Sequence, residues 1–89
     1  MRIKEGFVLR EVAGQIVVIA TGEASKGFHG MIKLNATGKD IWIGLTEGKQ
    51  ESEIVSELQE KYQIEKVQVE QDVREFISQM TELGFLVNE

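Results

Sequence analysis

The first third of the chain alternates runs of strand-forming residues with short polar breaks. Phe7–Val12 and Gln15–Ala20 are rich in β-branched and aromatic side chains, and only Ala13-Gly14 separates them. Two such runs joined by a two-residue link that ends in glycine predict a β-hairpin. The second run is apolar on both faces, which is typical of a central strand. The polar residues 21–27 that follow predict a loop.

A third strand is predicted over Phe28–Leu34. Gly30 interrupts this run and indicates a bulge or a close approach of another backbone. Met31 and Lys33 alternate with Ile32, so one set faces the protein interior and the other faces solvent. The alternation alone leaves open which set faces the interior.

The first of three predicted helices covers residues 36–45. Asn35 is a favourable N-cap for this helix, and Gly48 ends the segment. Residues spaced by four positions, with one neighbour beside them, form a single stripe that we expect to be buried: Thr37, Ile41, Leu45 and Trp42.

Two further helices carry apolar stripes of the same kind. The second is predicted over about Glu51–Tyr62, with acidic residues outward and three apolar side chains inward: Ile54, Val55 and Leu58. The third is predicted over about Val67–Leu83, with apolar residues spaced by three or four: Val69, Val73, Phe76, Met80 and Leu83. Gly84 is a natural C-terminal stop, and we expect Phe85–Val87 to pack as a short strand.

Three strands followed by three helices predict one α+β domain over residues 1–89, a winged helix-turn-helix-like fold with a three-stranded antiparallel sheet. In DNA-binding proteins of that outline the last helix enters the major groove. Here the net charge is +2 over residues 1–46, −5 over residues 47–75 and −2 over residues 76–89. Because duplex binding relies on Lys and Arg that neutralise phosphates, an acidic helical half argues against nucleic acid as a partner.

The composition narrows the chemistry further. The 89 residues include no Cys and one His, and the formal net charge is −5. The lack of Cys excludes thiolate metal sites and cysteine nucleophiles, and a single His argues against a His-based metal site. No nucleophile or paired-acid constellation is present, so we expect no catalytic residues, no metal and no cofactor. No segment has the pattern of a signal peptide or a membrane span, which predicts a cytoplasmic protein with no membrane partner.

Several segments together resemble the PqqD family over nearly the whole chain. The most specific is Leu34-Asn35-Ala36-Thr37-Gly38-Lys39-Asp40-Ile41-Trp42, which has the family pattern Leu-Asn-x-Thr-Gly-x-x-Ile-Trp. The spacing of two later segments supports it: Asp72-Val73-Arg74-Glu75-Phe76-Ile77 and Leu83-Gly84-Phe85-Leu86. Gln50 departs from the family, in which Ser or Thr usually caps the second helix. This departure weakens the cap and not the resemblance.

The resemblance implies a RiPP recognition element, a domain that serves the biosynthesis of ribosomally made and later modified peptides. Such a domain binds the leader segment of a precursor peptide and presents the precursor to a modifying enzyme, often a radical SAM protein. In the family the leader adds as an extra antiparallel strand to the third strand of the sheet, in a groove beside the third helix. Relatives serve several pathways, so the family does not fix the precursor, the enzyme or the oligomeric state.

This implied geometry, combined with a helical projection, selects candidate groove residues. Three residues lie within about 40° of the core line that passes through Val69: Val73, Phe76 and Met80. Ile77 lies about 80° from that line, on the flank that also carries Glu70 and Arg74, and it fits the edge of the core as well as a groove. The candidate peptide-binding residues from the strand and the helix are therefore Phe28, Gly30, Met31, Ile32, Lys33, Glu70, Val73, Arg74 and Ile77.

Conspicuous residues elsewhere have plain structural roles. We expect Trp42, Phe76 and Met80 in the core, Asn35 as a helix cap and His29 on the surface of a strand. The acidic run in the helical half is more typical of a solvated face than of a docking surface.

Three classes of function compete. We favour a leader-peptide-binding adaptor, which needs no reactive side chain. The alternative is an acidic protein–protein docking or regulatory winged-helix domain. A DNA-binding winged helix has the right outline but the wrong charge, and an independent enzyme activity is least expected.

Overall fold

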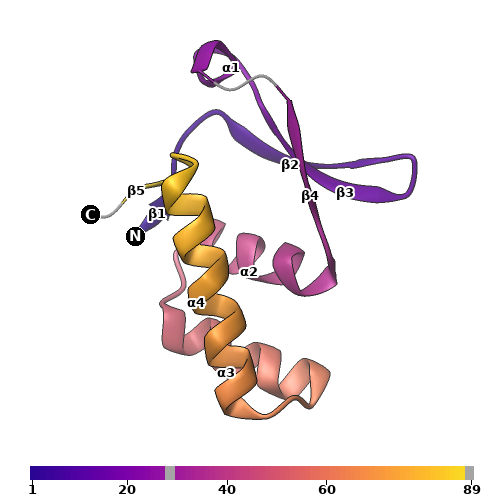
Figure 1. Cartoon of the computed structure of the whole chain (residues 1–89), viewed down its shortest axis with the longest axis vertical. Coiled ribbons are helices and arrows are strands. Elements are labelled where there is room, and N and C mark those ends of the chain that lie inside the picture. The colour runs from indigo at the N-terminus through magenta and orange to yellow at the C-terminus, as the bar shows by residue number, and fades with distance from the viewer. Residues whose placement is uncertain (28–29, 88–89) are drawn as a thin grey trace.

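A small sheet and three long helices make up most of the molecule (Figure 1). The computed structural model describes residues 1–27 and 30–87. In chain order the elements are β1 (Arg2–Ile3), β2 (Phe7–Val12), β3 (Gln15–Ala20), α1 (Ala24–Gly27), β4 (Met31–Leu34), α2 (Ala36–Thr46), α3 (Glu51–Tyr62), α4 (Lys66–Glu82) and β5 (Leu86–Val87). This order confirms the predicted α+β class. None of the helices in these ranges is long and apolar enough to cross a membrane.

The main sheet has the strand order β2-β3-β4, and both of its pairings are antiparallel. Strands β2 and β3 form the predicted hairpin. Ala13 and Gly14 have φ angles of 52° and 80°, the left-handed values that a two-residue type I′ turn requires. The consecutive residues Val17 and Val18 of the central strand are both buried, as an apolar run on two faces predicts.

Local sequence signals set the ends of the helices. The Oδ1 atom of Asn35 accepts a hydrogen bond of 2.8 Å from the N–H of Gly38, which confirms the predicted cap of α2. At the start of α3 the backbone N–H of Gln50 donates to Oε1 of Glu53 at 3.1 Å. The Glu53 side chain thus supports Gln50, which is a weak N-cap residue. Gly84 follows the end of α4 with a φ of 82°, and this confirms the predicted stop.

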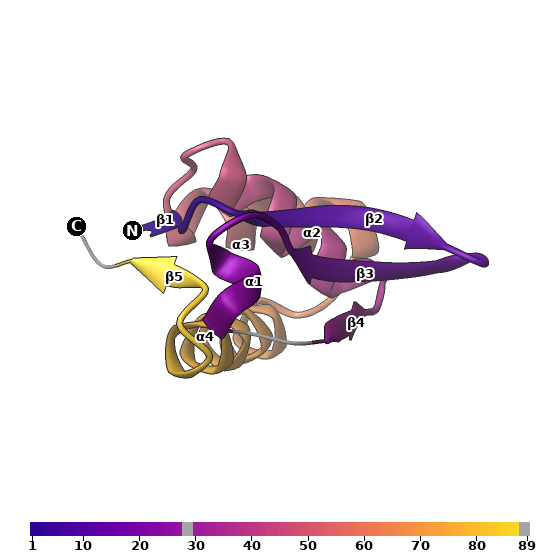
Figure 2. The same cartoon turned by 90° about the horizontal axis from the view of Figure 1, so that it is seen from above.

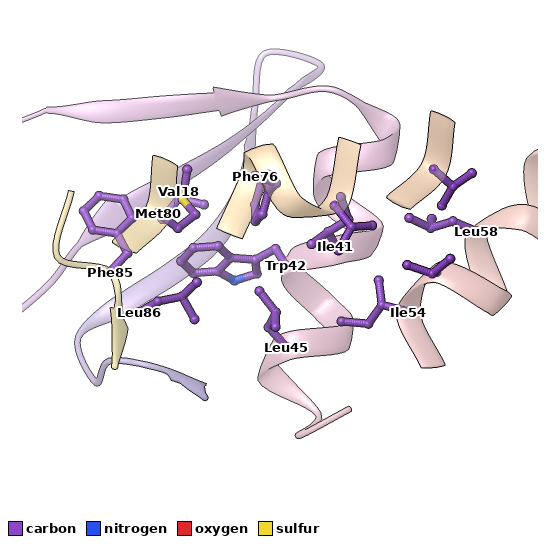
Figure 3. Packing of buried hydrophobic residues seen from close by; sticks show 13 residues of the cluster. Val18, Ile41, Trp42, Leu45, Ile54, Leu58, Phe76, Met80, Phe85 and Leu86 are labelled. Atoms are coloured by element: carbon purple, nitrogen blue, oxygen red, sulfur yellow. The ribbon is translucent and has the colours of Figure 1, made fainter. Parts of the chain in front are cut away.

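One hydrophobic core joins the helices to the inner face of the sheet (Figure 3). Trp42 of α2 is 3% exposed and meets the edge of the Phe85 ring at a centroid distance of 6.3 Å. Phe85 also stacks on Phe7 at 4.1 Å, and Val18 adds a fully buried side chain from β3. Each large apolar side chain buried in this way stabilises the fold by about 1.5–3 kcal/mol. The core positions predicted for Trp42, Phe76 and Met80 are confirmed.

The two ends of the chain meet in a second sheet. The predicted strand near the C-terminus is present as β5, and it pairs antiparallel with β1, a strand too short to show a period in the sequence. The expectation that Leu83 ends the buried stripe of α4 is wrong, since its side chain is 47% exposed. The helix stops before it, and Phe85, beyond the turn at Gly84, is the residue that enters the core.

The connection between β3 and β4 differs from the predicted loop. It contains the short helix α1, in which the hydroxyl of Ser25 donates to the carbonyl oxygen of Gly22 at 2.6 Å. The third strand of the main sheet begins at Met31, later than predicted. The earlier part of that prediction, Phe28 and His29, lies outside the described residues.

Candidate functional site

Strand β4 lies at an edge of the main sheet. Among the described strands only β3 pairs with it, so the N–H and C=O groups on its other side have no strand partner. An edge of this kind is a template on which an extended peptide can add as a further strand. Gly30, a predicted site residue, leads into the strand with a φ of 144° and is exposed. Phe28, another predicted site residue, lies outside the described part of the chain.

A groove of about 490 Å³ lies between this strand edge and α4. Figures 1 and 2 show that α4 lies across from β4 and that α2 begins directly after this strand. The lining residues come from all three elements: Ile32, Lys33, Leu34, Asn35, Thr37, Gly38, Ile41, Asp72, Glu75, Phe76, Gln79 and Met80. The unpaired edge and a groove that can receive side chains therefore occur at the same place.

Alternate residues of β4 turn toward opposite faces of the sheet. Ile32 and Leu34 are half-buried and pack against the core at the groove. Met31 is 54% exposed, and Lys33 is exposed with it on the other face. The structure thus decides what the sequence left open: Ile32 faces the interior, whereas Met31 and Lys33 face solvent. Of the predicted strand residues, Ile32 and Lys33 border the groove.

The wall that α4 contributes is apolar at its base and polar at its rim. Phe76 and Met80 are 8% and 3% exposed and belong to the core, so they form the apolar base. Asp72, Glu75 and Gln79 border the same groove. The wall can therefore hold an apolar side chain deep in the groove and a polar or charged one nearer to solvent.

The predicted helical residues lie on the other flank of α4. Glu70 and Arg74 line a separate cavity of about 490 Å³ between α3 and α4. Val73 is completely buried, and Ile77 is half-buried against the core, and neither lines the groove beside β4. The expectation that this flank faces the third strand of the sheet is wrong. Helical periodicity identifies the buried stripe, but it does not say which element lies beside each margin of that stripe.

Sequence reasoning missed the opposite margin of α4 and the start of α2. Three polar residues spaced by three and four positions marked that margin: Asp72, Glu75 and Gln79. A second signal was Gly38, which belongs to the family pattern. A Cβ atom at this position would lie 3.4 Å from Cε2 of Phe76 and 3.5 Å from Cβ of Leu34. The tight contact of that Cβ atom would be with Oδ1 of Asn35 at 3.2 Å, so a glycine here leaves room for the N-cap of α2 beside the groove.

The described residues with clearly shifted pKa values lie away from the groove. Oδ2 of Asp40 accepts a hydrogen bond from the Tyr62 hydroxyl, and Nζ of Lys61 lies 3.0 Å from the same oxygen. Burial raises the pKa of Asp40, but hydrogen bonds from Tyr62 and Lys61 outweigh it and hold that pKa below its ordinary value. Lys49 bridges Glu57 and Glu47, and hydrogen bonds to these two carboxylates raise its pKa. These contacts join α3 to α2 and its C-terminal end, so they are structural.

The residues that line the groove offer binding rather than reactive chemistry. They include two carboxylates, one amine, two amide side chains and one hydroxyl. Within residues 1–27 and 30–87 no group of three His, Cys, Asp or Glu side chains is arranged to hold a metal ion. The groove is thus suited to contacts with a peptide backbone and with its side chains.

Known proteins resemble this chain in sequence and in fold. The solved structure "TbiB1 in Complex with the TbiA(beta) Leader Peptide" has a TM-score of 0.80 and 26% identity, over 100% of this chain and 98% of that one. "Lasso peptide synthetase B1 complexed with the leader peptide" has a TM-score of 0.79 and 17% identity, over 98% of this chain and 96% of that one, and supports the fold. A search of curated proteins by sequence found no match.

The sequence profile described as "Coenzyme PQQ synthesis protein D (PqqD)" matches residues 5–86. This range takes in β4, α2 and α4, the three elements that surround the groove. It also takes in the hairpin and the α3 helix, so the match extends over the core as well as the site. The chain therefore belongs to the PqqD family.

Proposed function

We propose that this protein is a non-catalytic adaptor that binds the leader segment of a ribosomally made precursor peptide and presents the precursor to a modifying enzyme. The observation that carries the proposal is the open edge of β4 beside the groove against α4. An adaptor of this kind meets its precursor where the ribosome makes it, in the cytoplasm.

Strand addition accounts for binding with few sequence demands. A leader in extended conformation would pair its N–H and C=O groups with the free side of β4, and these main-chain hydrogen bonds would supply affinity. Alternate leader side chains would point into the groove, where Leu34, Phe76 and Met80 offer an apolar surface. The remaining side chains would face solvent together with Met31 and Lys33.

The comparisons support this assignment in two ways. TbiB1, which is similar to this chain over its whole length, is described in complex with a leader peptide. Family membership supports the second partner, because the resemblance to the PqqD family implies a modifying enzyme, often a radical SAM protein, that receives the precursor. The adaptor itself then requires neither a cofactor nor catalytic residues.

The proposal is tested with the leader of a precursor encoded beside this gene. Isothermal titration calorimetry of the folded protein with the synthetic leader should give saturable one-to-one binding. A second series methylates one leader backbone nitrogen at a time. Because strand pairing uses the amides of alternate residues, methylation should abolish binding at alternate positions within one stretch of about four residues and should be tolerated between them.

Two outcomes would contradict the proposal. A leader that fails to bind to folded protein removes the adaptor role and favours an acidic docking or regulatory domain. Methylation that has the same small effect at every position would show that the leader binds without adding a strand. An oligonucleotide duplex at low salt is the control ligand, and we expect no binding because the acidic α4 repels phosphate.

A further inference from the structure

The basic residues of α4 lie on only one of its two flanks. Its two basic side chains, Lys66 and Arg74, line the cavity against α3. The flank toward β4 carries Asp72 and Glu75 and no basic residue. An occupant of the groove therefore meets negative charge on the helical wall.

Neither groove carboxylate has a cationic partner within the described chain. Asp72 accepts a hydrogen bond of 2.8 Å from Nε2 of Gln68, and Glu75 accepts one of 3.4 Å from Nε2 of Gln71. The ion pairs of the described residues involve other carboxylates. Lys33, the one basic residue among the described residues that line the groove, belongs to the solvent-facing side of β4. Both carboxylates thus keep free acceptor oxygens for a ligand.

The acidic part of the wall has a defined position along the groove. Figure 1 shows α4 running in the opposite sense to β4, so its first half lies toward the C-terminal end of the strand. Phe76 and Leu34 both lie within 3.5 Å of a Cβ placed on Gly38, which fixes this register. Asp72 and Glu75 precede Phe76 and therefore lie toward the Leu34 end of β4.

We propose that the groove selects an extended peptide with a Lys or Arg at a groove-facing position next to Asp72 and Glu75, and with a large apolar residue at an alternate position beside Phe76 and Met80. The inference rests on the proposed function and specifies its ligand. In a strand antiparallel to β4 the basic residue precedes the apolar one in the peptide sequence. Charge-assisted hydrogen bonds to the two carboxylates would hold the head of that side chain, and its aliphatic stem would cover the apolar base.

The partly apolar surroundings strengthen this selection. An ion pair on an open surface contributes little, because water screens both charges. At the rim of the groove the peptide strand and the α4 wall exclude part of that water, so the attraction is larger than on a free helix face. Charge of this kind discriminates among peptides more than it raises the affinity of all of them.

The test uses a display library of random 12-residue peptides selected on the wild-type protein. We expect enriched peptides to share one basic position, with a large apolar residue two or four places after it. For one enriched peptide, made synthetically, replacement of the basic residue by Gln should weaken binding by about tenfold in calorimetry. The affinity of the unchanged peptide should fall with added salt.

Matched variants test whether the preference for a basic peptide residue arises in the groove. The double variant Asp72→Asn, Glu75→Gln should lose the preference for the basic residue, and Glu75→Lys should shift the selection toward acidic residues. The control Glu60→Gln, Glu82→Gln also removes two exposed carboxylates, but from outside the groove, and should select the same peptides as wild type.

The outcomes separate this inference from the proposed function. If peptides are enriched without a shared basic position, or if the Asp72, Glu75 double variant selects the same peptides as wild type, the charge selection is wrong and peptide binding stands. If the folded wild-type protein enriches no peptide at all, both the ligand class and the adaptor role are overturned.

Discussion

The two flanks of α4 both carry charged side chains but face different neighbours. Toward α3 lie Glu70 and Arg74, in a cavity whose other residues all belong to helices or to the turn before α3. Toward β4 lie Asp72 and Glu75, beside a strand edge with free backbone groups. Polar residues at the margin of a buried stripe therefore say little about function by themselves. The neighbouring element decides whether a margin can receive a peptide strand.

The largest effect should come from Phe76, where the groove and the core share one side chain. Phe76→Ala should lower the free energy of unfolding by about 3–5 kcal/mol, because a buried ring leaves a cavity. Phe76→Leu should cost less than Phe76→Ala, because it leaves a smaller cavity, and it should still weaken leader binding since the ring surface in the groove is lost. Urea unfolding and calorimetry measure the two effects. Wild-type affinity in Phe76→Leu would show that the leader does not use this wall.

Val73 is buried in the core as Phe76 is, but it does not line the groove beside β4. Val73→Ala should lower the free energy of unfolding by about 2 kcal/mol, because this fully buried side chain loses its packing in the core. The affinity of the folded protein for the leader should stay unchanged, since Val73 does not line the groove. Calorimetry under conditions where both proteins are fully folded makes the comparison. A large loss of affinity would mean that the leader reaches the α3 side of α4.

The contacts of Asp40 with Tyr62 and Lys61 lie outside both flanks of α4 and serve as a reference. Their contribution to the free energy of unfolding should depend on pH. Asp40→Asn should cost about 1 kcal/mol at pH 7, because the bonds from Tyr62 and Lys61 to the carboxylate are weakened. The pKa of Asp40 is lower in the folded state than its ordinary value of 3.8, so this stability is present above about pH 4 and is lost as pH falls through the folded pKa. Urea unfolding at pH 7, 5 and 3 should show the two proteins converging in acid. An equal difference at pH 7 and pH 3 would contradict the assignment to the Asp40 carboxylate.

The smallest effect should follow from neutralising the charges on the flank toward α3. Glu70→Gln with Arg74→Gln should change the free energy of unfolding by less than about 0.5 kcal/mol, because neither side chain takes part in an ion pair among residues 1–27 and 30–87. Leader affinity should be that of wild type. Calorimetry against the same peptide used for Val73→Ala decides the point, and a tenfold loss would place the leader on this flank.

Sequence reasoning reached the fold by signals that act over a few residues. The cap at Asn35, the turn at Ala13-Gly14 and the stop at Gly84 each depend on the local backbone, and all three were predicted. The strand β1 was missed because a pairing of two residues has no period to detect. Leu83 was assigned to the core because its spacing continues the stripe, although the helix ends one residue earlier.

The structure brings part of the predicted site set to the groove. Ile32 and Lys33 border it, and the family resemblance had pointed to the third strand of the sheet. The predicted helical residues lie elsewhere, with Glu70 and Arg74 in the cavity against α3. Ile77 was predicted to line the groove because it is an apolar residue at the edge of the buried stripe. The margin of α4 that borders the groove beside β4 is instead the polar one, which carries Glu75.

The sequence alone determined the family, the order of the main strands and long helices, and most of the buried stripe of each long helix, since these depend on the spacing of residues along a single element. Only the tertiary structure decided which face of β4 meets the core and which flank of α4 meets β4. These depend on how α2, α3 and α4 pack in one hydrophobic core, and packing is a property of contacts between elements distant in sequence. The candidate groove lies where those contacts leave an edge strand beside α4.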